Sequence, residues 1–247
     1  MKGLLLTMTE PPRPMEEEFN AWYDTEHLPE RLAIPGFVSA RRWVDSQAAA
    51  GSGKYLATYE LDRPQTLQTP DYLARVGEHL TPWSKRCLSR CVLFRRWACA
   101  QILPGDAAPS ADARALYLAC GDAPAEHEVE FNLWYDTEHI PLLAAVPGVL
   151  RARRFLDPDG KPRYIALYEL AAASVASSAP WHAALVTPWA KRIDTLTRDC
   201  EWILATYVAY ESLPASGESV PFAADQSGQQ SCPPRANGDM VAKRSEP

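Results

Sequence analysis

The chain has 247 residues, of which 47% are hydrophobic and 23% charged, and these values are typical of a globular protein with a buried core. Its formal net charge of −6 argues against the broad basic face that nucleic-acid binding requires. No apolar run approaches the roughly 18 residues that span a membrane, and Leu4-Leu5-Leu6 is too short for a secretory signal. The six cysteines form no CxxC pair and no metal-ligand spacing. We therefore expect a soluble cytoplasmic protein without nucleic-acid, membrane or metal partners.

The sequence repeats itself. Residues 19–45 read FNAWYDTEHLPERLAIPGFVSARRWVD and residues 131–157 read FNLWYDTEHIPLLAAVPGVLRARRFLD, with 16 of 27 positions identical. The similarity continues from 55–61 to 164–170 and from 81–86 to 187–192. We predict two duplicated repeats at 1–104 and 114–213 with a linker at 105–113. Residues 214–247 are rich in Ser, Gly, Gln and Pro, which predicts a disordered tail.

The elements of the first repeat follow in chain order. Residues 4–7 form a short apolar strand, and 16–28 a helix that Pro29 is expected to end. Strands at 37–45 and 54–61 then form a hairpin, Thr81-Pro82 opens a second helix, and a last strand lies near 94–102. The second repeat begins and ends with strands near 116–120 and 201–210.

This β-α-β-β-α-β order predicts a ferredoxin-like unit. Two such sheets packed face to face form an α/β barrel. We therefore predict an α+β fold in which the two repeats make an internal pseudo-dimer, so that the chain is a monomer.

The phase of each element suggests which side chains meet. At 100° per residue, the apolar side of the first helix holds Phe19, Trp22, Tyr23 and Glu26, with His27 at its edge and Asn20 and Asp24 outside it. Alternation in the next strand places Val38, Ala40, Arg42 and Val44 on one face and Phe37, Ser39, Arg41 and Trp43 on the other.

This layout resembles the dimeric α/β-barrel superfamily over about 200 of the 247 residues. The first helix is most similar to EthD-type proteins through an aromatic residue, then His and Pro: Tyr23, His27 and Pro29, and again Tyr135, His139 and Pro141. The superfamily includes isomerases, cofactor-free monooxygenases, polyketide cyclases and haem enzymes, so the resemblance leaves the reaction open. The first strand lacks the catalytic His of several relatives, and the sequence offers no persuasive axial ligand for haem.

Glu26 and Glu138 are the most unusual residues, because a lone carboxylate on an apolar helix face is expensive to bury. Their expected partners are Arg42 and Arg154. Either the pairs lock helix to sheet, or they tune a carboxylate for acid–base catalysis. Arg42 and Arg154 are also candidates for binding substrate.

His27 and His139 are candidate general acids or bases, because imidazole titrates near neutral pH. The alternative is a histidine that interacts with the last carbonyl groups of its helix. Tyr59, Tyr168, Trp22 and Trp134 are candidates for the substrate-binding wall, although Tyr59 and Tyr168 also suit aromatic packing. Glu30-Arg31 in the first repeat becomes Leu142-Leu143 in the second, so the two pockets differ chemically.

No phosphate-binding loop, dinucleotide fingerprint or serine nucleophile motif is present in the sequence, so we expect no cofactor. The favoured function is His-based proton transfer by an isomerase, lyase or cyclase on an aromatic, lactone or polyketide-like compound. The alternatives are a cofactor-free monooxygenase of electron-rich aromatics and a non-catalytic ligand-binding or accessory protein.

Overall fold

The structure, a computed structural model, describes residues 1–45 and 47–211. The predicted tail at 214–247 lies outside the described residues. Among the residues described, no helix is both long and apolar enough to cross a membrane.

Eight antiparallel strands close into a barrel in the order β1-β3-β2-β8-β5-β7-β6-β4. The first four are β1 (Gly3–Glu10), β2 (Phe37–Val44), β3 (Tyr55–Leu61) and β4 (Leu93–Leu103). The other four are β5 (Ala115–Gly121), β6 (Val149–Leu156), β7 (Tyr164–Leu170) and β8 (Ile203–Ala209). Pairing of β2 with β8 and of β4 with β6 joins the two halves. The predicted ferredoxin-like α+β fold is confirmed.

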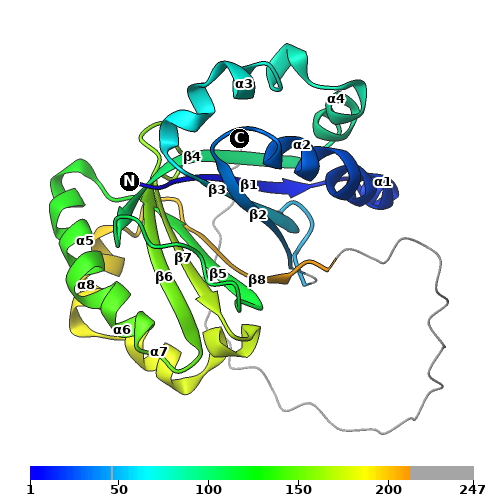
Figure 1. Cartoon of the computed structure of the whole chain (residues 1–247). Helices are drawn as coiled ribbons and strands as arrows, with labels where there is room; N and C mark the ends of the chain where they lie inside the picture. The colour runs from blue at the N-terminus through cyan, green and yellow to red at the C-terminus, as the bar shows by residue number, and fades with distance from the viewer. Residues whose placement is uncertain (46, 212–247) are drawn as a thin grey trace, which may run out of the picture. The chain divides into compact units, whose positions relative to one another are not determined.

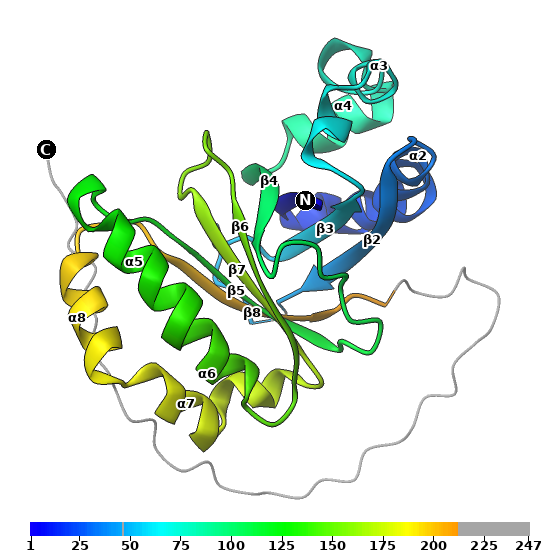
Figure 2. The same ribbon diagram turned by 60° about the vertical axis from the view of Figure 1, so that its left-hand side comes forward.

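Helices cover the outer face of each half (Figures 1 and 2). The first half carries α1 (Glu16–Trp22), α2 (Leu28–Leu32), α3 (Pro70–Leu73) and α4 (Pro82–Ser89). The second carries α5 (Glu128–Trp134), α6 (Ile140–Ala144), α7 (Ala179–Leu185) and α8 (Pro188–Leu196). Short 3-10 turns connect these elements at η1 (Arg13–Met15), η3 (Pro64–Gln68), η4 (Gly77–His79), η5 (Ala125–His127) and η7 (Ala173–Ser177). The helix predicted to open at Thr81-Pro82 is confirmed, because the Thr81 hydroxyl accepts the Ser84 N–H at 3.0 Å.

One wide π turn interrupts the first helix of each half, at η2 (Tyr23–His27) and η6 (Tyr135–His139). The N–H of Leu28 donates to the carbonyl of Tyr23, five residues back. The expectation that Pro29 ends the helix is wrong, because the helix continues to Leu32. A proline inside a helix lacks a donor and clashes with the preceding turn, and here the wide π turn lies directly before the turn that contains Pro29.

Three clusters of buried side chains form the core. One fills the barrel, with Trp43, Trp97, Phe155 and Tyr207 among its members. The other two lie between each sheet and its helices and are built around Phe19 and Phe131.

A bulge in β2 between Phe37 and Ser39 changes the predicted strand faces. It places Phe37 in the cluster under the helices, while Trp43 points into the barrel, and Val38 is 60% exposed. The predicted common face of Phe37 and Trp43 is therefore wrong, because a bulge shifts the alternation by one residue.

Candidate functional site

A cavity of about 530 Å³ lies in the first half, between the sheet and α3. Its apolar lining consists of Leu5, Leu67, Leu73, Val76, Leu80, Leu88 and Phe94. Its polar lining consists of Thr7, Tyr23, His27, Arg31, Tyr59, Tyr72 and Arg96. A volume of this size and an apolar wall with a few converging polar groups are typical of small-molecule sites.

The π turn places His27 in this cavity. A π turn adds residues to the helical turn, so the side chains after Tyr23 no longer follow 100° steps. His27 therefore leaves the edge of the apolar stripe and packs between the helix and the sheet. Its ring centroid lies 4.5 Å from that of Trp22, 5.1 Å from that of Tyr23 and 6.4 Å from that of Tyr59.

His27 is an uncharged imidazole at neutral pH. Burial, together with the nearby guanidinium groups of Arg31 and Arg42, lowers the pKa of His27 to about 3. Its Nδ1 atom is buried and has no hydrogen-bond partner among the described residues. Burying a polar atom without a hydrogen bond costs free energy, unless a bound molecule forms that hydrogen bond.

A chain of hydroxyl groups crosses the cavity next to His27. The Tyr59 hydroxyl donates to the Tyr23 hydroxyl at 3.1 Å, and the Tyr23 hydroxyl lies 3.2 Å from Thr7 Oγ1. Burial raises the pKa of Tyr59 well above its ordinary value. Tyr59 therefore acts as a neutral hydrogen-bonding group and not as a phenolate.

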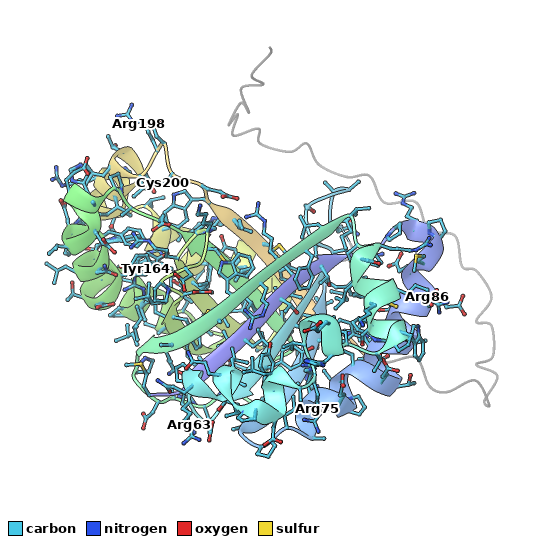
Figure 3. All side chains as sticks on the ribbon, turned by 90° about the horizontal axis from the view of Figure 1, so that it is seen from above. Arg63, Arg75, Arg86, Tyr164, Arg198 and Cys200 are labelled. Carbon is cyan, nitrogen blue, oxygen red and sulfur yellow. The ribbon has the colours of Figure 1, made fainter. Side chains whose placement is uncertain are left out.

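Arg31 and Arg96 bring positive charge to the cavity. Arg31 is 2% exposed and donates to Glu30 Oε2 at 3.0 Å and to the Arg75 carbonyl at 2.5 Å. Arg96 lies on β4 and donates to the Tyr72 hydroxyl at 3.2 Å. Arg75, labelled in Figure 3, belongs to the segment that follows α3.

The equivalent place in the second half is filled by aromatic rings. His139 lies 4.2 Å from Trp134 and 6.4 Å from Tyr168, just as His27 does in the first half. Tyr117, however, stands where β1 has Leu5, and its ring lies 5.1 Å from Trp181, the counterpart of Tyr72. Tyr168 completes this aromatic group, with its ring 6.1 Å from that of Tyr117 and 5.4 Å from that of Trp181.

His139 and Tyr168 carry buried atoms that find no hydrogen-bond partner in the described parts of the chain. Burial and the charge of Arg154 lower the pKa of His139 to about 3. Ala119 pairs with β7 at the register where Thr7 pairs with β3, so the second half lacks one hydroxyl. The second half therefore has a histidine in the same position as His27, but without the hydroxyl group of Thr7 beside it.

Glu26 does not pair with Arg42, and this sequence expectation is wrong. Glu26 accepts hydrogen bonds from Thr81 Oγ1 at 2.5 Å and Ser84 Oγ at 3.2 Å, at the start of α4. In the second half, Glu138 accepts from Thr187 Oγ1 at 2.6 Å and from Trp134 Nε1 at 3.2 Å. Neither carboxylate is among the described residues that line the cavity.

Arg42 and Arg154 instead bind residues that the 100° phase had placed outside the apolar stripe. Arg42 donates to Asp24 and Asn20, both at 2.6 Å. Arg154 donates to Asp136 at 2.6 Å and Asn132 at 2.9 Å. The two arginines therefore connect helix to sheet, and the π turn explains why Asp24 and not Glu26 is within reach.

Trp22 and Trp134 are core residues, and their indole rings pack against the imidazoles of His27 and His139. Trp22 is fully buried and donates to Ser84 Oγ at 3.1 Å. Of the predicted site residues, the structure brings His27 and Tyr59 together in the cavity, and His139 and Tyr168 in the filled second half. The residues that sequence reasoning missed are Arg96, Tyr72 and Thr7, whereas the change from Arg31 to Leu143 had already indicated a difference between the halves.

Within residues 1–45 and 47–211, no group of three or more His, Cys, Asp or Glu side chains is arranged to hold a metal ion.

No known family model matches the chain, and no curated protein is significantly similar to it. Several solved structures share its fold. An anthrone oxidase-like protein superposes with a TM-score of 0.56 at 12% identity, covering 85% of this chain and 91% of its own. A protein assigned as a monooxygenase from Lactobacillus acidophilus gives 0.54 at 11% identity, covering 84% and 93%. A protein assigned as a chlorite dismutase gives 0.50 at 11% identity, covering 86% and 96%. These similarities establish the fold.

Proposed function

We propose that the chain is a small-molecule enzyme in which His27 transfers a proton to or from a ring compound bound in the first-half cavity. The observation that carries this proposal is the uncharged imidazole of His27 in the wall of a mostly apolar cavity, because its buried Nδ1 atom has no hydrogen-bond partner among the described residues. A proton is the species transferred, so the proposed chemistry needs no cofactor. The substrate class is an aromatic, lactone or polyketide-like compound, and the reaction type is that of an isomerase, lyase or cyclase.

The roles of the cavity residues follow from their charge. His27 accepts a proton from an acidic O–H or C–H group of the substrate. A pKa of about 3 makes the empty imidazole a weak base, but the oxyanion that forms beside it favours the imidazolium. Arg31 stabilises the same oxyanion, and the hydroxyl pair of Tyr59 and Tyr23 orients it.

A second candidate function shares the first step. A carbanion formed by removing a proton from an electron-rich ring can react directly with oxygen, as in a cofactor-free monooxygenase. The similarity to an anthrone oxidase-like protein and to a protein assigned as a monooxygenase favours this variant. A non-catalytic binding protein is the third possibility and is an outcome of the test below.

The relationship to EthD-type proteins and the origin of the halves by duplication belong to the same proposal. Their support is the Tyr-x₃-His-x-Pro pattern, which places Tyr23 and His27 in one cavity wall and recurs at Tyr135 and His139. We further propose that the chain is a monomer, because its strands close the barrel within one chain. Light scattering should give 27.4 kDa, and twice that mass would contradict the proposal.

The test uses anthrone as a carbon acid. Under argon in D₂O, the protein should accelerate exchange of the anthrone methylene protons, followed by NMR. His27→Gln should slow this exchange by about 100-fold or more, the usual contribution of a general base. The exposed His79→Gln is the matched control.

Repeating the reaction in air, with oxygen uptake as the measurement, distinguishes the candidate functions. Oxygen uptake at a 1:1 ratio with anthrone, forming anthraquinone and water, indicates the monooxygenase. Exchange without protein-dependent oxygen uptake supports the isomerase, lyase or cyclase type. Absence of accelerated exchange, or exchange that is the same in His27→Gln, contradicts His27-dependent proton transfer on this compound and favours the binding protein.

A further inference from the structure

We propose, building on the proposed function of the first-half cavity, that this cavity is selective for ring compounds carrying a carboxylate, which Arg31 and Arg96 bind together. The inference concerns the substrate class and can fail while the proton-transfer role of His27 stands.

The first argument is the charge of the cavity wall. Arg31 and Arg96 both line it, and none of its described lining residues is acidic. Glu30 binds Arg31 from outside the lining, with Oε2 at 3.0 Å from a terminal guanidinium nitrogen. Arg96 has no carboxylate within salt-bridge distance among the described residues. The wall therefore carries more positive than negative charge.

The second argument is an unsatisfied donor. The Nε atom of Arg31 is buried and lacks a hydrogen-bond partner within the described part of the chain. Leaving part of a buried guanidinium unpaired is expensive, since the group gives up hydration without compensation. A carboxylate is the natural complement, because it accepts charge-assisted hydrogen bonds from a guanidinium.

The third argument is the position of Tyr72, which relates the two arginines. The Arg31 guanidinium carbon lies 5.8 Å from the centre of the Tyr72 ring, and Arg96 donates to the hydroxyl of the same residue at 3.2 Å. Arg31 is buried, whereas Arg96 is exposed on β4. Both arginines therefore lie beside Tyr72, and the proposal places the carboxylate next to this residue with the ring of the ligand against the apolar wall.

The fourth argument is an internal comparison. The second half has Leu143 at the position of Arg31 and Leu204 at the register of Arg96. The same helix-on-sheet fold forms there without either cation. The fold therefore does not require these arginines, and a ligand gives them a reason to be present in the open cavity.

The experiment compares two probes that differ in charge, 1-hydroxy-2-naphthoate and its methyl ester, by titration calorimetry with the full chain. The acid should bind wild type at least about tenfold more tightly than the ester, as expected when a hydrogen bond to a charged group is gained. Arg96→Leu should weaken binding of the acid about tenfold and change binding of the ester little.

Glu30→Leu/Arg31→Leu reproduces the leucine pair of the second half and should remove the preference for the acid. Arg192→Leu, on the exposed face of α8, is the matched control and should retain it. If the double variant does not fold, the exposed Arg96→Leu decides the question alone.

Equal binding of acid and ester by wild type, or binding of neither probe, overturns this inference. Equal loss of both probes in Arg96→Leu also overturns it, because charge would then not be what Arg96 contributes. If binding discriminates by charge but anthrone exchange is independent of His27, this inference stands and His27-dependent proton transfer on anthrone is contradicted. If anthrone exchange depends on His27 but acid and ester bind equally, the proposed proton transfer stands and this inference fails.

Discussion

The imidazole of His27 lies against the indole of Trp22, with 4.5 Å between the ring centroids. The same relationship recurs at 4.2 Å between His139 and Trp134. In each half the π turn moves the histidine off the solvent edge of its helix and under the helical layer. Burial at these two positions has a measurable consequence for stability.

We predict that the free energy of unfolding falls steeply as the pH drops below about 6.5. Both histidines have a pKa of about 3 in the folded chain, far below the ordinary value of 6.5 that applies when the chain is unfolded. Between these values the unfolded state binds the extra proton, so each histidine lowers the free energy of unfolding by up to about 1.4 kcal/mol per pH unit. Urea denaturation from pH 7 to pH 4 measures this dependence.

The variant His27→Gln/His139→Gln isolates the effect of the two imidazoles. Its stability should fall less steeply with decreasing pH than that of wild type, because the titrating groups are gone. His79→Gln, at an exposed position, should keep the wild-type dependence. Parallel curves for wild type and the double variant would show that the imidazoles are not held neutral.

Glu26→Ala should destabilise the chain without abolishing proton exchange. The carboxylate accepts hydrogen bonds from Thr81 and Ser84 at the start of α4, and hydrogen bonds to a charged acceptor contribute about 1.5–3 kcal/mol. We expect a loss of that size in urea denaturation and an anthrone exchange rate close to that of wild type. Exposed Glu17→Ala is the control for stability. A large loss of exchange at unchanged stability would instead assign Glu26 to catalysis.

Arg153 connects the two halves inside the barrel. It donates to Glu60 of β3 at 2.8 and 2.9 Å and to Glu169 of β7 at 2.5 Å, and its side chain is 2% exposed. The barrel interior buries this arginine. Arg153→Met leaves two buried carboxylates unpaired and should cost about 3–5 kcal/mol.

Arg163→Met is the comparison for Arg153→Met, because Arg163 also pairs with two carboxylates, Asp122 and Glu128, but at a side-chain exposure of 31%. Each of these partly exposed pairs should contribute about 1 kcal/mol or less. Equal effects of the two substitutions on the urea midpoint would contradict the role given to Arg153.

Tyr117→Leu/Trp181→Tyr should open a second cavity. The two substitutions install the residues of the first half, Leu5 and Tyr72, at the equivalent positions, and the volume they remove should cost about 1–3 kcal/mol. Calorimetry with the neutral naphthoate ester should then give two sites per chain, compared with one in wild type. A stoichiometry of one in the variant would show that other residues close the second half.

The order of helices and strands was predictable because the same hydrophobic pattern occurs in both repeats, so each half supports the assignment of the other. The helix phase was not, because 100° steps assume a regular α-helix and the π turn at Tyr23–His27 breaks that assumption. Asp24 and Glu26 both lie in this turn, and it is Asp24 that pairs with Arg42 while Glu26 binds Thr81.

The cavity itself was beyond sequence reasoning. Its presence in one half depends on the sizes of side chains that meet from separate elements, such as Leu5 with Tyr72 and Tyr117 with Trp181. Arg96 was equally hidden, since an exposed arginine on a strand resembles any solvated charge until Tyr72 is seen beside it.

The most direct measurement is an NMR spectrum of the five histidine side chains, labelled with ¹⁵N, with and without 1-hydroxy-2-naphthoate. His27→Gln and His139→Gln assign the two buried signals. Both imidazoles should be neutral from pH 7 to pH 5, and the probe should shift the His27 signal while leaving His139 unchanged. A protonated His27 in this range, or a probe that shifts His139 and not His27, would contradict the first-half cavity as the site of proton transfer.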